Sequence, residues 1–127
     1  MSRPTVAVID LKALRANFAL AQSLTPGAST IPMVKANAYG HGMIEVSRAL
    51  SESAPAFGVA SIDEALVLRE AGIKQPILLL EGTFSCDEVG VAADNNFILM
   101  VENSAQKDAI LNASISRPVS VWLGIDT

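Results

Sequence analysis

The sequence predicts an α/β protein built around a parallel β-sheet, and three observations support this fold class. Five short apolar runs start 26, 20, 20 and 22 residues apart, an interval that suits one strand followed by one helix. The runs are almost continuously hydrophobic, as in parallel strands that are covered on both faces. Helical patterns separate the runs. The expected strands are residues 31–36, 57–61, 77–81, 97–101 and 119–125.

The segment before the first expected strand is predicted to contain an extended piece and then a helix. Residues 5–9 are expected to be extended, and residues 11–24 carry a helical apolar pattern with intervening alanines. Thr25-Pro26-Gly27 follows this pattern and ends the predicted helix, because proline and glycine interrupt regular structure.

A further helix is predicted over residues 62–71. Ser61 precedes it and Glu64 follows three residues later, the spacing of a capping box that satisfies free N–H groups at a helix start. Gly72 comes directly after the pattern, where glycine commonly caps the C-terminus of a helix. Pro76 then opens the next strand.

Composition restricts the class of protein. Half of the 127 residues are hydrophobic and 17% are charged, as in a folded domain or part of one. With 9 Lys and Arg against 13 Asp and Glu, the net charge is -4, and no basic stripe favours nucleic acid as a partner. The single Cys86 excludes an internal disulfide, and the N-terminus lacks the features of a secretory signal. No apolar run is long enough for a membrane span, so a soluble, cytoplasmic protein is expected.

Repeated βα units allow two architectures. An open doubly wound sheet and a closed (β/α)8 barrel both use right-handed crossovers, and the sequence period alone does not choose between them. A barrel takes about 250 residues and eight strands. With five expected strands, this chain would form only the N-terminal part of a barrel, and such a fragment alone is expected to be inactive because it leaves a parallel sheet edge exposed.

Candidate chemistry concentrates around Lys35, at the end of the first expected strand. Alternation along a strand places Met33 and Lys35 on the same face, and active sites of barrels lie at the C-terminal ends of strands. An amine that loses water there favours its neutral form and becomes a nucleophile or base, as Schiff-base chemistry requires. From spacing alone, a strand-end lysine whose head group simply reaches solvent is the favoured interpretation.

Three features follow Lys35 in the same turn. The phenol of Tyr39 could donate a hydrogen bond to a phosphate, although a half-buried structural aromatic is the alternative. Gly40 and Gly42 can let backbone N–H groups approach an anion closely. His41 has no second His and no Cys near it in the sequence, so a structural hydrogen bond is expected there and no metal site.

The stretch Met33 to Gly42 resembles the cofactor-attachment signature of alanine racemases, an apolar pair followed by Lys-Ala-Asn-Ala-Tyr-Gly-His-Gly. The eight-residue part is complete in this sequence. Further similarity extends over nearly the whole chain, at Val8-Ile9-Asp10-Leu11, Leu14-Arg15, Asn17, Phe57-Gly58-Val59-Ala60, Asp63-Glu64-Ala65, Leu68-Arg69, Gly72-Ile73, Pro76 to Gly82 and Ile125-Asp126-Thr127.

This resemblance implies a (β/α)8 barrel that binds pyridoxal 5'-phosphate, followed by a C-terminal β-domain, in a homodimer with shared active sites. Residues 1–127 would be the N-terminal portion of the barrel domain, with the rest of the barrel and the β-domain absent from this sequence. The implied reaction is the interconversion of L- and D-alanine, which supplies or consumes D-alanine, a peptidoglycan precursor. Lys35 would hold the cofactor and act as the base on the D-alanine side, Tyr39 would bind the phosphate, and Leu80 would contact the cofactor ring.

One departure from the family pattern concerns Gly124, where many members carry a carbamylated lysine that positions a substrate-binding arginine. The family's second catalytic base and its pyridine-nitrogen arginine have no counterpart in these 127 residues. A non-catalytic pyridoxal-phosphate carrier and a barrel decarboxylase remain alternatives, but the segment after Lys35 favours the racemase.

Overall fold

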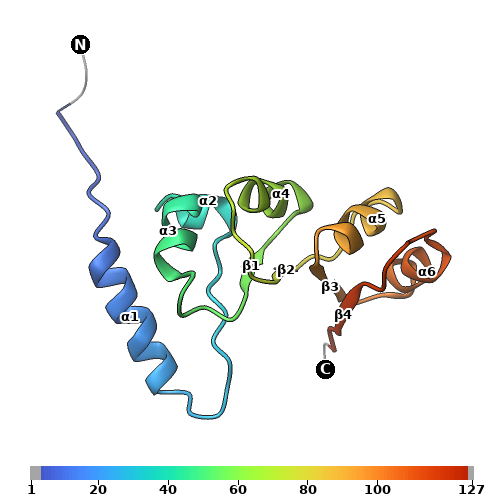
Figure 1. The fold of residues 1–127 in the computed structure, drawn as a ribbon, viewed down its shortest axis with the longest axis horizontal. Helices are drawn as coiled ribbons and strands as arrows, with labels where there is room; N and C mark the ends of the chain where they lie inside the picture. The colour runs from blue at the N-terminus through green and yellow to red at the C-terminus, as the bar shows by residue number, and fades with distance from the viewer. Residues whose placement is uncertain (1–3, 126–127) are drawn as a thin grey trace.

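The computed structural model describes residues 4–125, which form a four-stranded parallel sheet with helices along it (Figure 1). The strands β1 (Phe57–Val59), β2 (Ile77–Leu79), β3 (Phe97–Val101) and β4 (Ser120–Leu123) are neighbours in sequence order. A doubly wound sheet would reverse its strand order at a switch point. The unbroken order is instead that of the N-terminal part of a (β/α)8 barrel, in agreement with the predicted fold class.

Six helices connect and precede these strands in the described part of the chain. Their bounds are α1 (Leu11–Ser23), α2 (Lys35–Tyr39), α3 (Met43–Leu50), α4 (Ile62–Glu70), α5 (Asp87–Asp94) and α6 (Ser104–Asn112). Figure 1 shows α3 to α6 on one side of the strands. None of the helices within residues 4–125 is long and apolar enough to cross a membrane.

Burial differs from strand to strand, and β3 buries one of its faces more completely than the other. Along β3, Phe97, Leu99 and Val101 are buried, whereas the alternate residues Ile98 and Met100 are only partly covered. Phe97 and Leu99 belong to the same hydrophobic core as buried residues of the helices. Strands covered on both faces were expected, and this is confirmed for β1 and β2, in which every residue is buried. In β3 only the helix side is fully covered, and every residue of β4 is exposed. The less covered face of β3 corresponds to the interior of a barrel.

The prediction of a first strand over residues 31–36 is wrong. The structure retains a single parallel bridge, between Met33 and Gly58, with hydrogen bonds from Val34 N to Gly58 O at 2.8 Å and from Gly58 N to Pro32 O at 3.0 Å. The ladder ends there because the backbone turns into a left-handed conformation at Ala36. The segment still lies beside β1, where the first strand of the expected order belongs.

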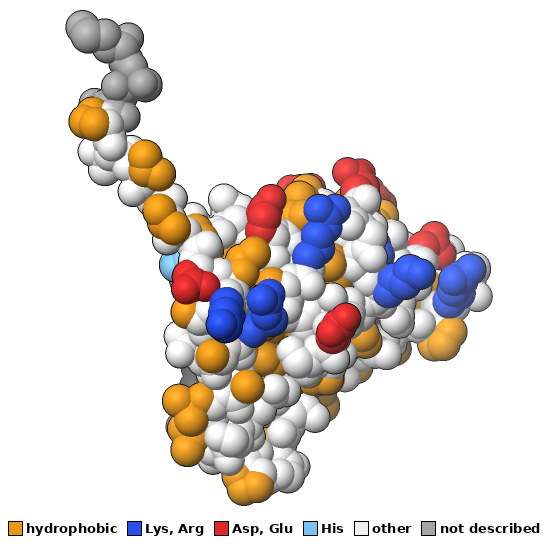
Figure 2. Space-filling view, turned by 60° about the vertical axis from the view of Figure 1, so that its left-hand side comes forward, with side chains coloured by type: hydrophobic (Ala, Val, Ile, Leu, Met, Phe, Trp, Pro, Cys, Tyr) orange, Lys and Arg blue, Asp and Glu red, His pale blue; other side chains and the backbone are white. Residues whose placement is uncertain are grey.

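The remaining strand predictions differ mainly in length. Residues 97–101 are confirmed, while β1, β2 and β4 are shorter than the expected 57–61, 77–81 and 119–125 because the chain leaves the sheet early. No strand forms within residues 4–10. Figure 1 shows this segment leading away from the helices, and Figure 2 shows apolar side chains along it. Val6 is 77% exposed and Val8 is 85% exposed.

The predicted capping of α4 is half right. Gly72 has φ +87° just after the C-cap Ala71, which confirms the glycine cap. Ser61 makes no side-chain capping hydrogen bond, contrary to the predicted capping box. Glu64 instead accepts a hydrogen bond from Ala60 N, one residue further back, at 2.8 Å.

Helix α1 has a side-chain cap that makes a stability prediction possible. Asp10 Oδ1 accepts hydrogen bonds from Lys12 N at 2.9 Å and from Ala13 N at 3.0 Å. Asp10→Ala should lower the free energy of unfolding by about 1 kcal/mol, because two N–H groups at the helix start lose their acceptor. Urea denaturation of the full chain measures this, and Asp10→Asn is the control because asparagine also caps helices well. Equal losses in the two variants would contradict the assignment.

Candidate functional site

The predicted site residues gather at the C-terminal ends of the strands. Met33 is in register with Gly58, Gly58 with Leu78, and Leu78 with Ile98. Two residues further along each segment lie Lys35, Ala60, Leu80 and Met100, and Met100 is in register with Trp122. Leu80 N still donates to Val59 O at 2.9 Å, which keeps Leu80 beside the end of β1. Lys35 and Leu80 therefore lie at the same end of the sheet, each just beyond a segment that is paired with β1.

The turn that follows Lys35 has an uncommon backbone. Ala36, Asn37, Ala38 and Tyr39 all have φ between 52° and 54°, so one left-handed turn lies within α2. The left-handed conformation costs roughly 1–2 kcal/mol for each residue with a Cβ atom. A run of four such residues persists only where surrounding contacts hold it, as is common at functional sites.

Two side chains within the turn help to hold it. Asn37 Oδ1 accepts a hydrogen bond from Met43 N at 2.8 Å, which joins the turn to the start of α3. His41 Nδ1 lies 3.0 Å from Ala38 O, as expected for a structural hydrogen bond of this histidine. The backbone adds a contact from Gly42 N to Asn37 O at 3.0 Å. Hydrogen bonds within the Lys-Ala-Asn-Ala-Tyr-Gly-His-Gly stretch therefore help to hold its conformation.

A third support comes from Glu64, which was predicted to cap the start of α4. Glu64 Oε1 accepts a hydrogen bond from Ala36 N at 2.7 Å, while its Oε2 accepts from Ala60 N. The carboxylate thus joins α4 to the residue directly after Lys35. The sequence signal was a glutamate in the first turn of a helix, which predicts local capping but not a contact 28 residues away.

The predicted cofactor residues present an amine, a phenol and an apolar side chain. Lys35 and Leu80 are half-buried, and Tyr39 is 63% exposed. No atom lies within 4 Å of the position that a Cβ would take at Gly40. A partly covered amine and a free phenol on one turn can attach a carbonyl compound and contact an anionic group of it.

Other residues considered in the sequence lie outside this group. A Cβ at Gly124 would lie 2.8 Å from Glu102 Cγ, so the Glu102 side chain occupies the space above this glycine. Cys86 is exposed. Trp122 in β4 is 44% exposed. Asp126, one of the positions similar to the family, lies outside the described residues.

Comparisons with known proteins agree on one family. The family model "Alanine racemase, N-terminal domain" matches residues 9–127. The catabolic alanine racemase of Pseudomonas aeruginosa is 48% identical over 125 residues, which cover 98% of this chain and 35% of that protein. The crystal structure of the biosynthetic alanine racemase from Pseudomonas aeruginosa matches with a TM-score of 0.92 and 41% identity, over 98% of this chain and 35% of that one.

A solved structure with a different printed substrate is also similar. The histidine racemase from Leuconostoc mesenteroides subsp. sake matches with a TM-score of 0.80 and 28% identity, over 89% of this chain and 31% of that one. The strand order and the rim site together define the chain as the N-terminal part of a (β/α)8 barrel. The chain belongs to the alanine racemase N-terminal domain family. It spans about a third of the length of the curated relatives it matches.

Proposed function

We propose that this chain supplies the lysine half of an alanine racemase active site, which interconverts L- and D-alanine. The observation that carries the proposal is the position of Lys35 at the C-terminal rim of a parallel sheet, at the start of a turn with the complete Lys-Ala-Asn-Ala-Tyr-Gly-His-Gly sequence. Relatives that are 46–48% identical and named alanine racemase support the reaction.

The donor set fits pyridoxal 5'-phosphate. An aldehyde requires an amine, and Lys35 is half-buried at the rim. A phosphate requires hydrogen-bond donors, and the Tyr39 phenol is exposed on the same turn. A flat aromatic ring requires apolar contact, and Leu80 is half-buried at the same level of the sheet. These three residues are the ones we assign to the cofactor.

The chain's own residues have distinct tasks in this proposal. The bound cofactor would supply an electron sink that acidifies the α-proton of the amino acid. Lys35 Nζ would attach the cofactor and then hold or return the α-proton on one side, that of D-alanine. Tyr39 Oη would donate to the phosphate and keep the ring in place, while Leu80 would contact the ring and exclude water.

A second base on the opposite side must come from elsewhere, because these 127 residues have no counterpart of the family's catalytic tyrosine. We propose that it comes from the C-terminal β-domain of a partner subunit in a homodimer, as the family resemblance implies. The remaining strands of the barrel would cover the exposed edge at β4. A cytoplasmic location and a duty in peptidoglycan precursor supply stay predictions.

A racemase for another amino acid is the second candidate. The similar histidine racemase shares this part of the fold, so this part alone does not select the side chain of the substrate. The activities of the full-length protein on alanine and on histidine separate the two candidates. A kcat/KM for histidine above that for alanine would favour the second candidate.

A spectrum tests cofactor attachment directly. The full-length protein, purified as the cell produces it, should show the near-visible absorbance of a Schiff base between lysine and pyridoxal phosphate. Borohydride should remove the band and fix the cofactor, and peptide mapping should place the label on Lys35. A label on Lys74, which is exposed on the loop before β2, would contradict the assignment.

A further inference from the structure

We propose that Glu64 is a positioning residue for Lys35, through the peptide group that joins Lys35 to Ala36. This inference rests on the proposed function of Lys35. Glu64 Oε1 accepts the hydrogen bond from Ala36 N at 2.7 Å. The peptide unit is planar, and its rigid plane contains the Ala36 N–H and the Cα of Lys35. Holding that N–H therefore fixes the plane from which the lysine side chain departs.

The chemistry of Glu64 suits its two targets. Both are backbone N–H groups, of Ala36 at 2.7 Å and of Ala60 at 2.8 Å, and each carboxylate oxygen accepts one of them. Such short contacts are typical of charge-assisted hydrogen bonds, which are about twice as strong as neutral ones. Ala36 is also the first residue with a left-handed backbone, so its N–H is fixed where the strained turn begins.

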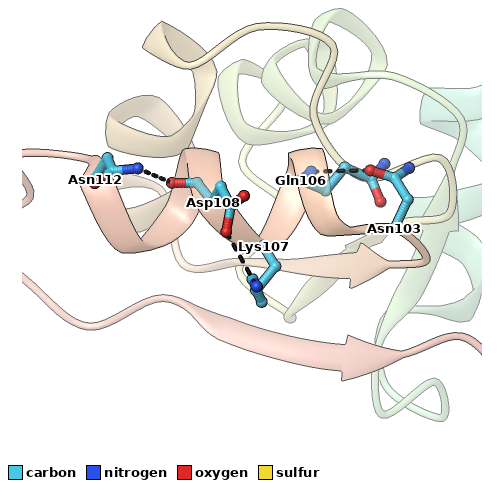
Figure 3. Close-up of polar contacts among 5 residues, drawn as sticks. All are labelled: Asn103, Gln106, Lys107, Asp108 and Asn112. Atoms are coloured by element: carbon cyan, nitrogen blue, oxygen red, sulfur yellow. Dashed lines mark hydrogen bonds and ion pairs between the residues drawn. The ribbon is translucent and has the colours of Figure 1, made fainter.

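Helix α6 makes a similar pair of contacts, and the loop that it contacts, after β2, contains no lysine. Gln106, also the third residue of its helix, accepts from Glu102 N at 2.8 Å through Oε1, four residues back. Its Nε2 donates to Glu81 O at 2.9 Å, in the loop after β2. Figure 3 shows Gln106 in the first turn of α6, where its backbone N–H donates to Asn103.

The two residues differ as their targets require. Glu64 reaches the N–H group of Ala36 in α2 and is a carboxylate with two acceptors, whereas Gln106 reaches a carbonyl in a loop and has an amide N–H to donate. Both therefore tie a helix start to the preceding βα unit. Glu64 alone of this pair holds the peptide next to Lys35.

This pair allows a matched experiment on the full chain loaded with pyridoxal phosphate. Glu64→Gln turns an amide N–H toward Ala36 N–H or Ala60 N–H, and Gln106→Glu turns a carboxylate oxygen toward Glu81 O; each change loses one hydrogen bond without a change in size. The readouts are the dissociation constant of the cofactor, the fraction of Lys35 that borohydride labels, and the urea midpoint.

We expect Glu64→Gln to weaken cofactor binding about ten-fold, the effect of losing one charge-assisted hydrogen bond, and to lower the labelled fraction of Lys35. Gln106→Glu should lower the urea midpoint about as much as Glu64→Gln does, because each variant loses one hydrogen bond. It should leave both cofactor readouts within about two-fold of wild type. Glu64→Ala, which loses both hydrogen bonds, should weaken cofactor binding further than Glu64→Gln.

Two results would overturn the inference in distinguishable ways. If wild type attaches the cofactor at Lys35 but Glu64→Gln and Gln106→Glu change the cofactor readouts equally, Glu64 acts only through stability. If wild type shows no attachment at Lys35, the proposed function fails and the positioning role fails with it.

Discussion

Lys35→Ala should lower kcat for alanine racemisation by about 10⁴-fold or more, because one side chain would serve both to attach the cofactor and to carry a proton. The near-visible band of the lysine-linked cofactor should be lost as well. Kinetics with L- and D-alanine and an absorbance spectrum of the full chain measure the two effects. We expect the fold to persist, since Lys35 is only half-buried and does not belong to the hydrophobic core.

Lys35→Arg and Lys12→Ala are the controls for this prediction. Arginine keeps a positive charge at the rim but lacks a primary amine, so Lys35→Arg should be as inactive as Lys35→Ala. Lys12 is an exposed lysine on α1, and its replacement should leave the rate unchanged. Activity of Lys35→Arg within about ten-fold of wild type would show that charge, and not Schiff-base chemistry, is what the site needs.

Gly82→Ala should reduce the free energy of unfolding by about 3 kcal/mol, the largest stability effect that we expect from a single methyl group in this chain. Gly82 has φ +69°, and an added Cβ would lie 2.4 Å from Met100 O. A backbone carbonyl in a paired strand cannot rotate away as a side chain can. The Cβ would also lie 2.8 Å from Gln106 Nε2 and disturb the contact of Gln106 with the same loop.

Gly72→Ala separates the two causes of this loss. Gly72 has φ +87° and no atom within 4 Å of an added Cβ, so its replacement introduces backbone strain without a clash. Its cost should be about 1 kcal/mol. Urea denaturation of both variants measures the difference, and equal losses would mean that the contact at Met100 O is easily relieved.

Much of the site was predictable because its signals are local. The position of a lysine at the end of an apolar run, the glycines that follow it and the order of βα units are all contained in short stretches of sequence. Tyr39 was expected in the turn that leaves the strand, and the structure confirms that turn. The residues that hold the turn were harder to predict, because the hydrogen-bond acceptor of Ala36 N lies 28 residues further along the chain.

By itself, the sequence determined the α/β class, the order of the helices and strands, and Lys35 as the cofactor candidate, since hydrophobic periodicity and an eight-residue motif encode them. The tertiary structure decided three things. It placed the strands side by side in sequence order and reduced residues 31–36 to one bridge at Met33. It also brought Glu64 of α4 to the backbone N–H of Ala36 in the preceding unit. These depend on the register between segments distant in the chain, and no local pattern of side chains specifies which backbone N–H a carboxylate will meet.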